Sequence, residues 1–310
     1  MYRNILIPTD GSPLSTAAAH AGVALAAQCG AAVVGVHVAP EYQYPVNIEI
    51  VVPEYPTEDD YRAAMRRRAA DYLDQVRAEA DALGVRFHGI TVLADNTADQ
   101  IVHAAGQNGC DLIFIGSHGR SGLGQLLLGS TTHKILTSCK IPALVYRVPH
   151  GRGPGDAAQA AAPALRIRRI LLPTDGSALS EAAAQHGIAL AAAIGASVVG
   201  MHVMPEFHTF AYHTELLEDT RAMFEEESRE YARKFLAAVE SAARTAGVEC
   251  LTTDVAHDHP WEAMIDTARE LGCDLIVMAS HGRKGVRSLL MGSETQKVLN
   301  HCAIPVIVYR

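Results

Sequence analysis

The sequence predicts two tandem α/β domains, each with a parallel β-sheet that carries helices on both faces. One observation behind this prediction is the alternation of short apolar runs, typical of buried strands, with longer helical patterns. The other is an internal repeat: residues 116–130, GSHGRSGLGQLLLGS, return as ASHGRKGVRSLLMGS at residues 279–293. Between residues 112–147 and 275–310, 20 of 36 aligned positions are identical, so the chain contains a duplication.

The length of 310 residues is sufficient for two domains of ordinary size. A stretch rich in Gly, Pro and Ala, residues 149–163, has the composition of a linker. After it the opening pattern restarts, because residues 168–177 repeat residues 3–12. We therefore expect a first domain at residues 1–148, a linker at 149–166 and a second domain at 167–310.

The elements of the first half follow from local patterns. Short apolar runs rich in Ile, Leu and Val predict strands at residues 4–8, 33–38, 85–93, 111–115 and 141–148. An alanine-rich segment that ends near Gln28 predicts the first helix. Charges on one face and apolar side chains on the other predict the second helix at residues 58–83. Shorter helices are expected at residues 98–107 and 131–138.

The second half repeats this order. Its first strand lies within residues 168–173, and later strands are expected at residues 198–203, 249–255 and 304–309. A long helix at about residues 214–246 replaces both the proline-rich segment at residues 40–56 and the helix that follows that segment.

The overall charge and hydropathy exclude two classes of partner. The formal net charge is −8, which argues against nucleic acid as the main partner. No apolar run is long enough to span a membrane, and the N-terminus leads directly into a strand without a signal-peptide pattern. We therefore expect a cytoplasmic protein that does not bind membranes.

The repeated stretch has the features of a phosphate-binding loop. Gly116, Gly119 and Gly129 allow the backbone to approach a ligand closely. Ser130 is the expected N-cap of the next helix, whose first amides and positive dipole end would face an anion. Arg120 adds a positive charge. This is neither a P-loop, which needs Gly-x4-Gly-Lys-Ser/Thr, nor a dinucleotide fingerprint, whose glycines follow the first strand.

A second repeated motif places a carboxylate at the end of the first strand of each half. Asp10 lies in Pro8-Thr9-Asp10, and Asp175 lies in Pro173-Thr174-Asp175. Ligands of parallel α/β sheets bind at the carboxyl ends of strands where the strand order reverses, so Asp10 and Gly116 can face one crevice. A carboxylate there is suited to hydrogen-bonding ribose hydroxyls, and the alternative is simple helix capping by Asp or Ser. Backbone groups of Val38 and Val203, which close the second strands, could contact an adenine edge.

These motifs resemble the universal stress protein family, and the resemblance covers nearly the whole chain outside the linker. The features that carry it are PTDGS in both halves, His37-Val38 with His202-Val203, and Gly-x2-Gly-x9-Gly-Ser from Gly116. The resemblance implies two tandem Rossmann-like (adenine nucleotide alpha hydrolase-like) domains, each a five-stranded parallel sheet in the order 3-2-1-4-5. It also implies ATP in the crevice, with Mg²⁺ as a candidate companion, and pairing through strand five, either within the chain as a pseudo-dimer or in a homodimer.

The family pattern also assigns roles to residues of this chain. It implies that Asp10 contacts the ribose, Val38 the adenine, and Gly116, Gly119, Gly129, Ser130 and Thr131 the phosphates. The matching positions of the second half are Asp175, Val203, Ala279, Gly282, Gly292, Ser293 and Glu294. The neighbouring residues expected at the two sites are Pro8, Thr9, Ser117, Arg120, Pro173, Thr174 and Arg283.

The second half departs from the pattern at two positions. Ala279 replaces the first glycine, which would cost about 1–2 kcal/mol if that position needs a positive φ and nothing if φ is negative. Glu294 replaces Thr131 and places a carboxylate beside the phosphates, which would repel them unless Mg²⁺ intervenes; Lys284 and Arg287 partly offset this charge. We expect the first half to bind ATP and the second half to bind it more weakly or not at all.

The sequence is compatible with three functional hypotheses. The leading one is a nucleotide-binding stress-response module that works by shape change or partner recruitment. The enzymatic alternative is slow ATP hydrolysis or self-phosphorylation on Ser117, Ser121 or Ser130, although no catalytic base is evident. The third is an interaction protein that needs no nucleotide in its second half. A metal site at His257 and His259 is a weaker hypothesis, because the segment precedes Pro260 and has the pattern of a loop.

Overall fold

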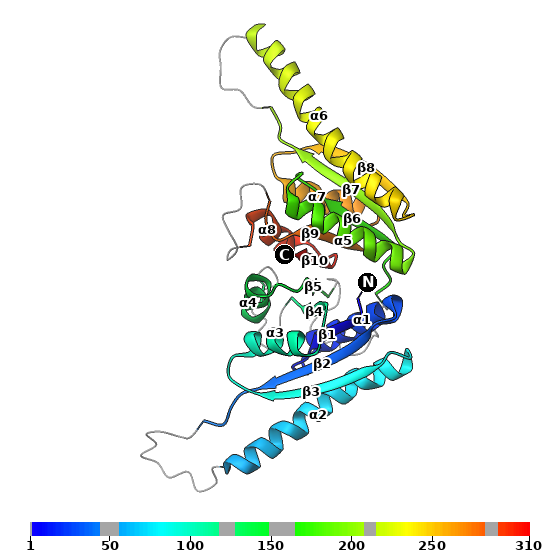
Figure 1. The fold of residues 1–310 in the computed structure, drawn as a ribbon. Coiled ribbons are helices and arrows are strands. Elements are labelled where there is room, and N and C mark those ends of the chain that lie inside the picture. The colour runs from blue at the N-terminus through cyan, green and yellow to red at the C-terminus, as the bar shows by residue number, and fades with distance from the viewer. Residues whose placement is uncertain (1, 44–55, 118–127, 149–164, 208–214, 283–290) are drawn as a thin grey trace, which may run out of the picture. The chain divides into compact units, whose positions relative to one another are not determined.

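A computed structural model describes residues 2–43, 56–117, 128–148, 165–207, 215–282 and 291–310 (Figure 1). These residues form two compact units. The first unit contains Tyr2–Ile135, and the second joins Leu136–Pro149 to Arg166–Arg310. No helix of the described ranges is both long and apolar enough to cross a membrane.

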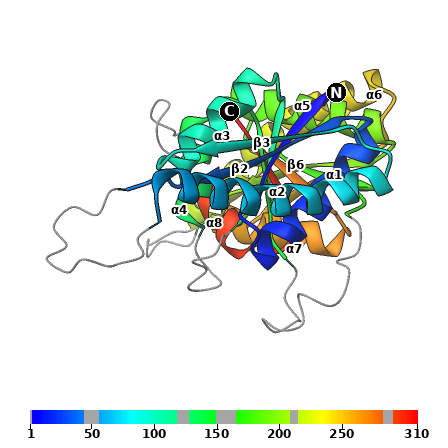
Figure 2. The same ribbon diagram turned by 90° about the horizontal axis from the view of Figure 1, so that it is seen from below.

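The first unit contains a four-stranded parallel sheet in the order β3-β2-β1-β4. Its strands are β1 (Asn4–Pro8), β2 (Ala32–Ala39), β3 (Phe87–Leu93) and β4 (Leu112–Gly116). Its helices are α1 (Pro13–Cys29), α2 (Glu58–Ala82), α3 (Thr97–Gln107) and the start of α4 (Ser130–Ser138). Because the order reverses at β1, right-handed crossovers place α1 and α2 on one face and α3 on the other. Figure 2 shows α2 along β2 and β3, against which it packs.

The second unit contains the complete second copy, with its own strands in the parallel order β8-β7-β6-β9-β10. Its strands are β6 (Arg169–Pro173), β7 (Ser197–Met204), β8 (Cys250–Ala256), β9 (Leu275–Ala279) and β10 (Val306–Tyr309). Its helices are α5 (Ala178–Ile194), α6 (Glu215–Thr245), α7 (Pro260–Glu270) and α8 (Ser293–His301). The order 3-2-1-4-5 predicted for a five-stranded sheet is confirmed in this copy.

The same unit also contains β5 (Ala143–Tyr146), the last strand of the first copy. β5 pairs with β10 in antiparallel orientation, with Val145 opposite Val306 and Leu144 opposite Ile307. The sheet of this unit is therefore mixed, because an antiparallel strand joins the parallel strands of the second copy at this edge.

The predicted element boundaries agree with the structure to within a few residues, and one difference has a clear cause. The third strand was expected from residue 85, but β3 begins at Phe87. The amide of Val85 instead donates to the carbonyl of Ala80 at 2.8 Å, after Gly84 at a φ of 67°. Val85 therefore belongs to the hydrogen-bonded end of α2, as in a helix that closes on a left-handed glycine.

The centre of the first unit is the buried pair β1 and β4. Ile5, Leu6, Ile7 and Phe114 are fully buried, as expected for strands that are covered on both faces. Phe114 lies under α1, where its ring comes within 3.1 Å of the position that a Cβ on Gly22 would take. This core fixes the two strands whose carboxyl ends carry Asp10 and Gly116.

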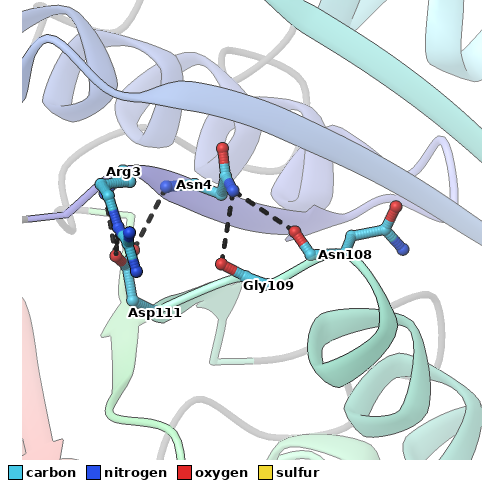
Figure 3. Close-up of polar contacts among 5 residues, drawn as sticks. All are labelled: Arg3, Asn4, Asn108, Gly109 and Asp111. Atoms are coloured by element: carbon cyan, nitrogen blue, oxygen red, sulfur yellow. Dashed lines mark hydrogen bonds and ion pairs between the residues drawn. The ribbon is translucent and has the colours of Figure 1, made fainter.

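The amino ends of β1 and β4 are joined by a carboxylate clamp, shown in Figure 3. Asp111 accepts hydrogen bonds from the amides of Arg3, at 2.9 Å, and Asn4, at 3.2 Å. The side-chain amide of Asn4 donates to the carbonyls of Asn108 and Gly109, each at 3.3 Å. Asp111 thus holds the start of β1 against the start of β4, at the amino ends of these strands, whereas Asp10 lies at the carboxyl end of β1.

Replacing Asp111 with alanine is expected to lower the free energy of unfolding by about 1–3 kcal/mol, because the two amides lose a charged acceptor. Urea unfolding followed by circular dichroism measures this change. Asp71→Ala, on the exposed face of α2, is the control and should change the free energy of unfolding by less than about 0.5 kcal/mol. Equal effects of the two substitutions would show that the clamp contributes nothing.

Candidate functional site

A cavity of about 320 Å³ lies at the carboxyl ends of β1, β2 and β4, beside the start of α4. The predicted site residues that line it are Pro8, Thr9, Asp10, Val38, Gly116, Gly129, Ser130 and Thr131. Sequence reasoning missed the other lining residues, which are Ser15, Val36, Thr97, Ile101, Ile115 and Thr132. The structure therefore brings the two repeated motifs of the first half to one place.

Three predicted residues of this half lie elsewhere or outside the described ranges. Ser117 is buried and does not line the cavity, and its carbonyl accepts a hydrogen bond from the amide of Gly129 at 2.9 Å. Gly119 and Arg120 lie outside the described residues. Ser117 thus connects the two ends of the loop instead of facing the cavity.

The turn that carries Asp10 is held by local hydrogen bonds. The amide of Ser12 donates to Asp10 Oδ1 at 2.9 Å, and Ser12 in turn caps α1 by accepting from the amide of Ser15 at 3.2 Å. The ring of His37 donates from Nδ1 to the carbonyl of Thr9 at 2.7 Å, since a carbonyl oxygen can only accept. The capping alternative is therefore correct for Ser12, while Asp10 forms the turn and lines the cavity.

Gly11 is required in this turn. Its φ of 73° lies in the left-handed region, and a Cβ built on it would overlap the ring of Tyr72 on α2. The packing of α2 thus fixes the position of the residue next to Asp10.

We expect Gly11→Ala to lower the free energy of unfolding by about 1–3 kcal/mol more than Gly30→Ala does, because only the first adds overpacking to backbone strain. Gly30 is a matched control, since its φ is 65° and no atom lies within 4 Å of the position that its Cβ would take. Urea titration of the two variants measures the difference. Equal destabilisation would contradict the role assigned to Tyr72.

The start of α4 differs from the prediction in one respect. The amide of His133 donates to the carbonyl of Gly129 at 2.9 Å, so Gly129 is the N-cap and Ser130 is the first helical residue. The predicted capping by Ser130 is wrong. A glycine cap has no side chain that could accept from the first amides of the helix, so these donors are suited to an outside anion. The hydroxyl of Thr132 ties this turn to the end of β4 by donating to the carbonyl of Gly116 at 3.0 Å.

The second unit contains the equivalent cavity, with a volume of about 560 Å³. Its lining includes the predicted residues Pro173, Thr174, Asp175, Val203, Ala279, Gly282, Gly292 and Ser293. Arg283 lies outside the described residues. A Cβ built on Gly282 would lie 2.5 Å from Asp175 Oδ2, so the glycine loop passes directly against the carboxylate.

The start of α8 repeats the geometry found at α4. Gly292 is its N-cap and makes no side-chain capping bond, and Ser293 is its first residue. The amide of Gly292 donates to the carbonyl of Ser280 at 2.8 Å, and the hydroxyl of Thr295 donates to the carbonyl of Ala279 at 3.0 Å. Equivalent residues at the end of the strand and at the start of the helix are therefore bonded in the same way in both copies.

The Ala279 departure has no backbone cost. Gly116 is the last residue of β4 and Ala279 the last residue of β9, and Ala279 pairs with Tyr309 as a strand residue. Both positions therefore have an extended backbone, which any residue can adopt. The cost of about 1–2 kcal/mol that a positive φ would bring therefore does not apply at Ala279, since a strand residue has a negative φ.

Glu294 is the departure that changes the chemistry. Its Oε2 accepts from the amide of Trp261 at 3.0 Å, and its Oε1 lies 3.1 Å from the Lys297 ammonium. In the first half, Lys134, the residue equivalent to Lys297, is paired instead with Asp99 at 2.8 Å. The second cavity thus carries an anchored carboxylate where the first cavity has the hydroxyl of Thr131.

His257 and His259 are joined by a local hydrogen bond. The Nδ1 atom of His257 accepts from the amide of His259 at 2.9 Å, and the two ring centroids are 5.9 Å apart. Among the described residues, no group of three or more His, Cys, Asp or Glu side chains is placed to hold a metal ion.

Comparison with known proteins decides the family. The model of the universal stress protein family matches residues 1–147 and again residues 166–310. The chain belongs to the universal stress protein family. It is a tandem member, because both halves match the same family model.

Individual relatives agree with this family assignment. A universal stress protein of Mycolicibacterium smegmatis is 28% identical over 74% of this chain and 72% of its own length. One of Thermus aquaticus is 34% identical over 47% of this chain and its full length. The crystal structure of a universal stress protein from Archaeoglobus fulgidus covers 99% of this chain and 98% of its own, with a TM-score of 0.67 and 19% identity. At that identity the last comparison shows the fold alone.

Proposed function

We propose that this universal stress protein binds ATP in the first cavity and acts in the cytoplasm as a nucleotide-dependent stress-response module. The observation that carries the proposal is the meeting of Asp10, at the end of β1, with the glycine-capped start of α4 in one cavity. A carboxylate is suited to ribose hydroxyls, and the first amides of a helix are suited to phosphates. A cavity of about 320 Å³ lies within the range of small-molecule sites.

In this proposal each part of the cavity contacts one part of the nucleotide. Asp10 accepts hydrogen bonds from the ribose, and the backbone at Val38 contacts the adenine. Gly116, Gly129, Ser130 and Thr131 surround the phosphates, with Gly119 and Arg120 completing the loop and Mg²⁺ as a companion ion. The described lining contains one titratable side chain, Asp10, which already accepts the amide of Ser12. This favours binding over hydrolysis.

The proposal includes the organisation of the chain. We take residues 1–148 and 167–310 as the two domains, with residues 149–166 as their linker. We also propose that the halves associate through their fifth strands as an intramolecular pseudo-dimer. The antiparallel pairing of β5 with β10 within the second unit supports this arrangement.

Two measurements on the purified full-length protein test the proposed function. Isothermal titration with ATP should detect a binding site, and mass spectrometry of denatured protein should identify any adenine nucleotide retained through purification. Phosphate release measured over hours then separates a binding module from a slow ATPase, and the proposal expects no release above that of free ATP. A chain that neither retains nor titrates adenine nucleotides would overturn the proposed function.

A further inference from the structure

The two cavities differ systematically in their apolar walls. Three β-branched side chains of the first cavity are each replaced by methionine at the equivalent position of the second. The pairs are Val36 with Met201 on β2 and β7, Ile101 with Met264 on α3 and α7, and Ile115 with Met278 on β4 and β9. The strand register supports the first pair, because Pro8 lies opposite Val36 and Pro173 lies opposite Met201.

These replacements change what the wall can accommodate. Methionine is unbranched, flexible and polarisable, so it adapts to a flat ligand where Val and Ile present a fixed shape. The second cavity is also larger, at about 560 Å³ compared with about 320 Å³. The apolar part of the second site is therefore suited to a planar base.

The polar end of the second cavity differs in charge. Glu294 lies on the first turn of α8, where Thr131 lies on α4. Its carboxylate is held there by the amide of Trp261 and by Lys297, so it cannot simply swing away from the cavity without losing both contacts. Asp175 corresponds to Asp10 of the first cavity, so Glu294 is the one carboxylate that the described lining of the second cavity has in addition. A triphosphate placed as in the first cavity would meet like charge at this position.

We propose that the second cavity binds an uncharged purine nucleoside and discriminates against its triphosphate, with Glu294 as the residue that sets this specificity. This inference rests on the proposed function in one respect: it takes Asp175 and Val203 to hold ribose and base as Asp10 and Val38 do. The two halves of the protein then bind different ligands, a nucleotide in the first and a nucleoside in the second.

Titration of the full-length protein with ATP and with adenosine, each with and without Mg²⁺, tests this specificity. The wild-type chain should bind ATP at one site. Glu294→Gln keeps an acceptor for the amide of Trp261 but removes the charge. It should tighten ATP binding in the second cavity about tenfold or more, so that a second ATP site becomes detectable. Glu294→Thr, which copies the first half, should do the same. Glu270→Gln, at an exposed position of α7, is the charge-matched control and should leave one ATP site.

The reciprocal variant completes the design. Thr131→Glu should weaken ATP in the first cavity about tenfold or more, while adenosine still binds the second cavity. Two equal ATP sites in the wild-type chain, an unchanged ATP stoichiometry in both Glu294 variants, or no adenosine binding to Thr131→Glu would each overturn the inference. If ATP fails to bind the first cavity while adenosine binds the second, the proposed function fails and this inference stands. If ATP binds the first cavity and adenosine does not bind the second, the proposed function stands and this inference fails.

Discussion

Asp10→Asn is expected to weaken ATP binding in the first cavity about tenfold to a hundredfold, because a hydrogen bond to a charged group contributes about 1.5–3 kcal/mol. Asparagine retains an oxygen for the amide of Ser12, which Asp10 Oδ1 accepts at 2.9 Å, so the turn is preserved. It replaces the other carboxylate oxygen with an amide that cannot accept from a ribose hydroxyl. Isothermal titration with ATP measures the loss.

The matching substitution in the second half is the control. Asp175 accepts the amide of Ser177 at 3.0 Å in the same kind of turn, so Asp175→Asn makes the same chemical change at the other site. It should leave the first-cavity affinity for ATP unchanged. If the Asp10→Asn chain binds ATP as tightly as the wild type, the proposed contact between the Asp10 carboxylate and the ribose is wrong.

Phe114→Ala is expected to lower the free energy of unfolding of the first unit by about 3–5 kcal/mol, the usual cost of truncating a buried aromatic side chain. Phe114 is fully buried on β4, where its ring packs under α1 next to Gly22. Because α1 already lies close to β4 at this glycine, the helix cannot easily move in to fill the cavity that the removed ring leaves. Urea unfolding followed by far-ultraviolet circular dichroism measures the shift.

The single tryptophan makes the assignment to one unit possible. Trp261 lies on α7 in the second unit, so its fluorescence reports the unfolding of that unit. Val277→Ala, at the equivalent buried position of β9, should shift the fluorescence transition. Phe114→Ala should shift mainly the part of the circular dichroism transition that comes from the first unit, which the fluorescence of Trp261 does not report. Identical midpoints for Phe114→Ala and the wild type would contradict the role of this side chain.

Much of the fold could be predicted from the sequence because it depends on local pattern and repetition. Buried apolar runs separated by helices identify strands such as residues 4–8. Because such strands are parallel, their carboxyl ends lie at the same end of the sheet. The same pattern predicts that Asp10 lies near Gly116, and the structure brings both to one cavity. The antiparallel pairing of β5 with β10 was not evident from local pattern, since it joins strands far apart in the sequence.

The missed residues of the site depend on tertiary contacts that no local pattern encodes. Thr132 ties α4 to β4 through its hydroxyl, and Ile101 reaches the cavity from α3. Repetition offered a signal for the first of these, because Thr295 makes the same bond in the second copy. The predicted capping by Ser130 was wrong because residue preference alone favoured serine, whereas the backbone bond of His133 places Gly129 at the cap.

In the proposed function, the first cavity holds ATP between Asp10 and the start of α4. A crystal structure of the full-length protein with a non-hydrolysable ATP analogue at saturating concentration tests this claim most directly. We expect the ribose hydroxyls to donate to Asp10 and the phosphates to lie against the amides of Ser130 and Thr131. A first cavity without the analogue under these conditions, or an analogue whose phosphates point away from α4, would contradict it.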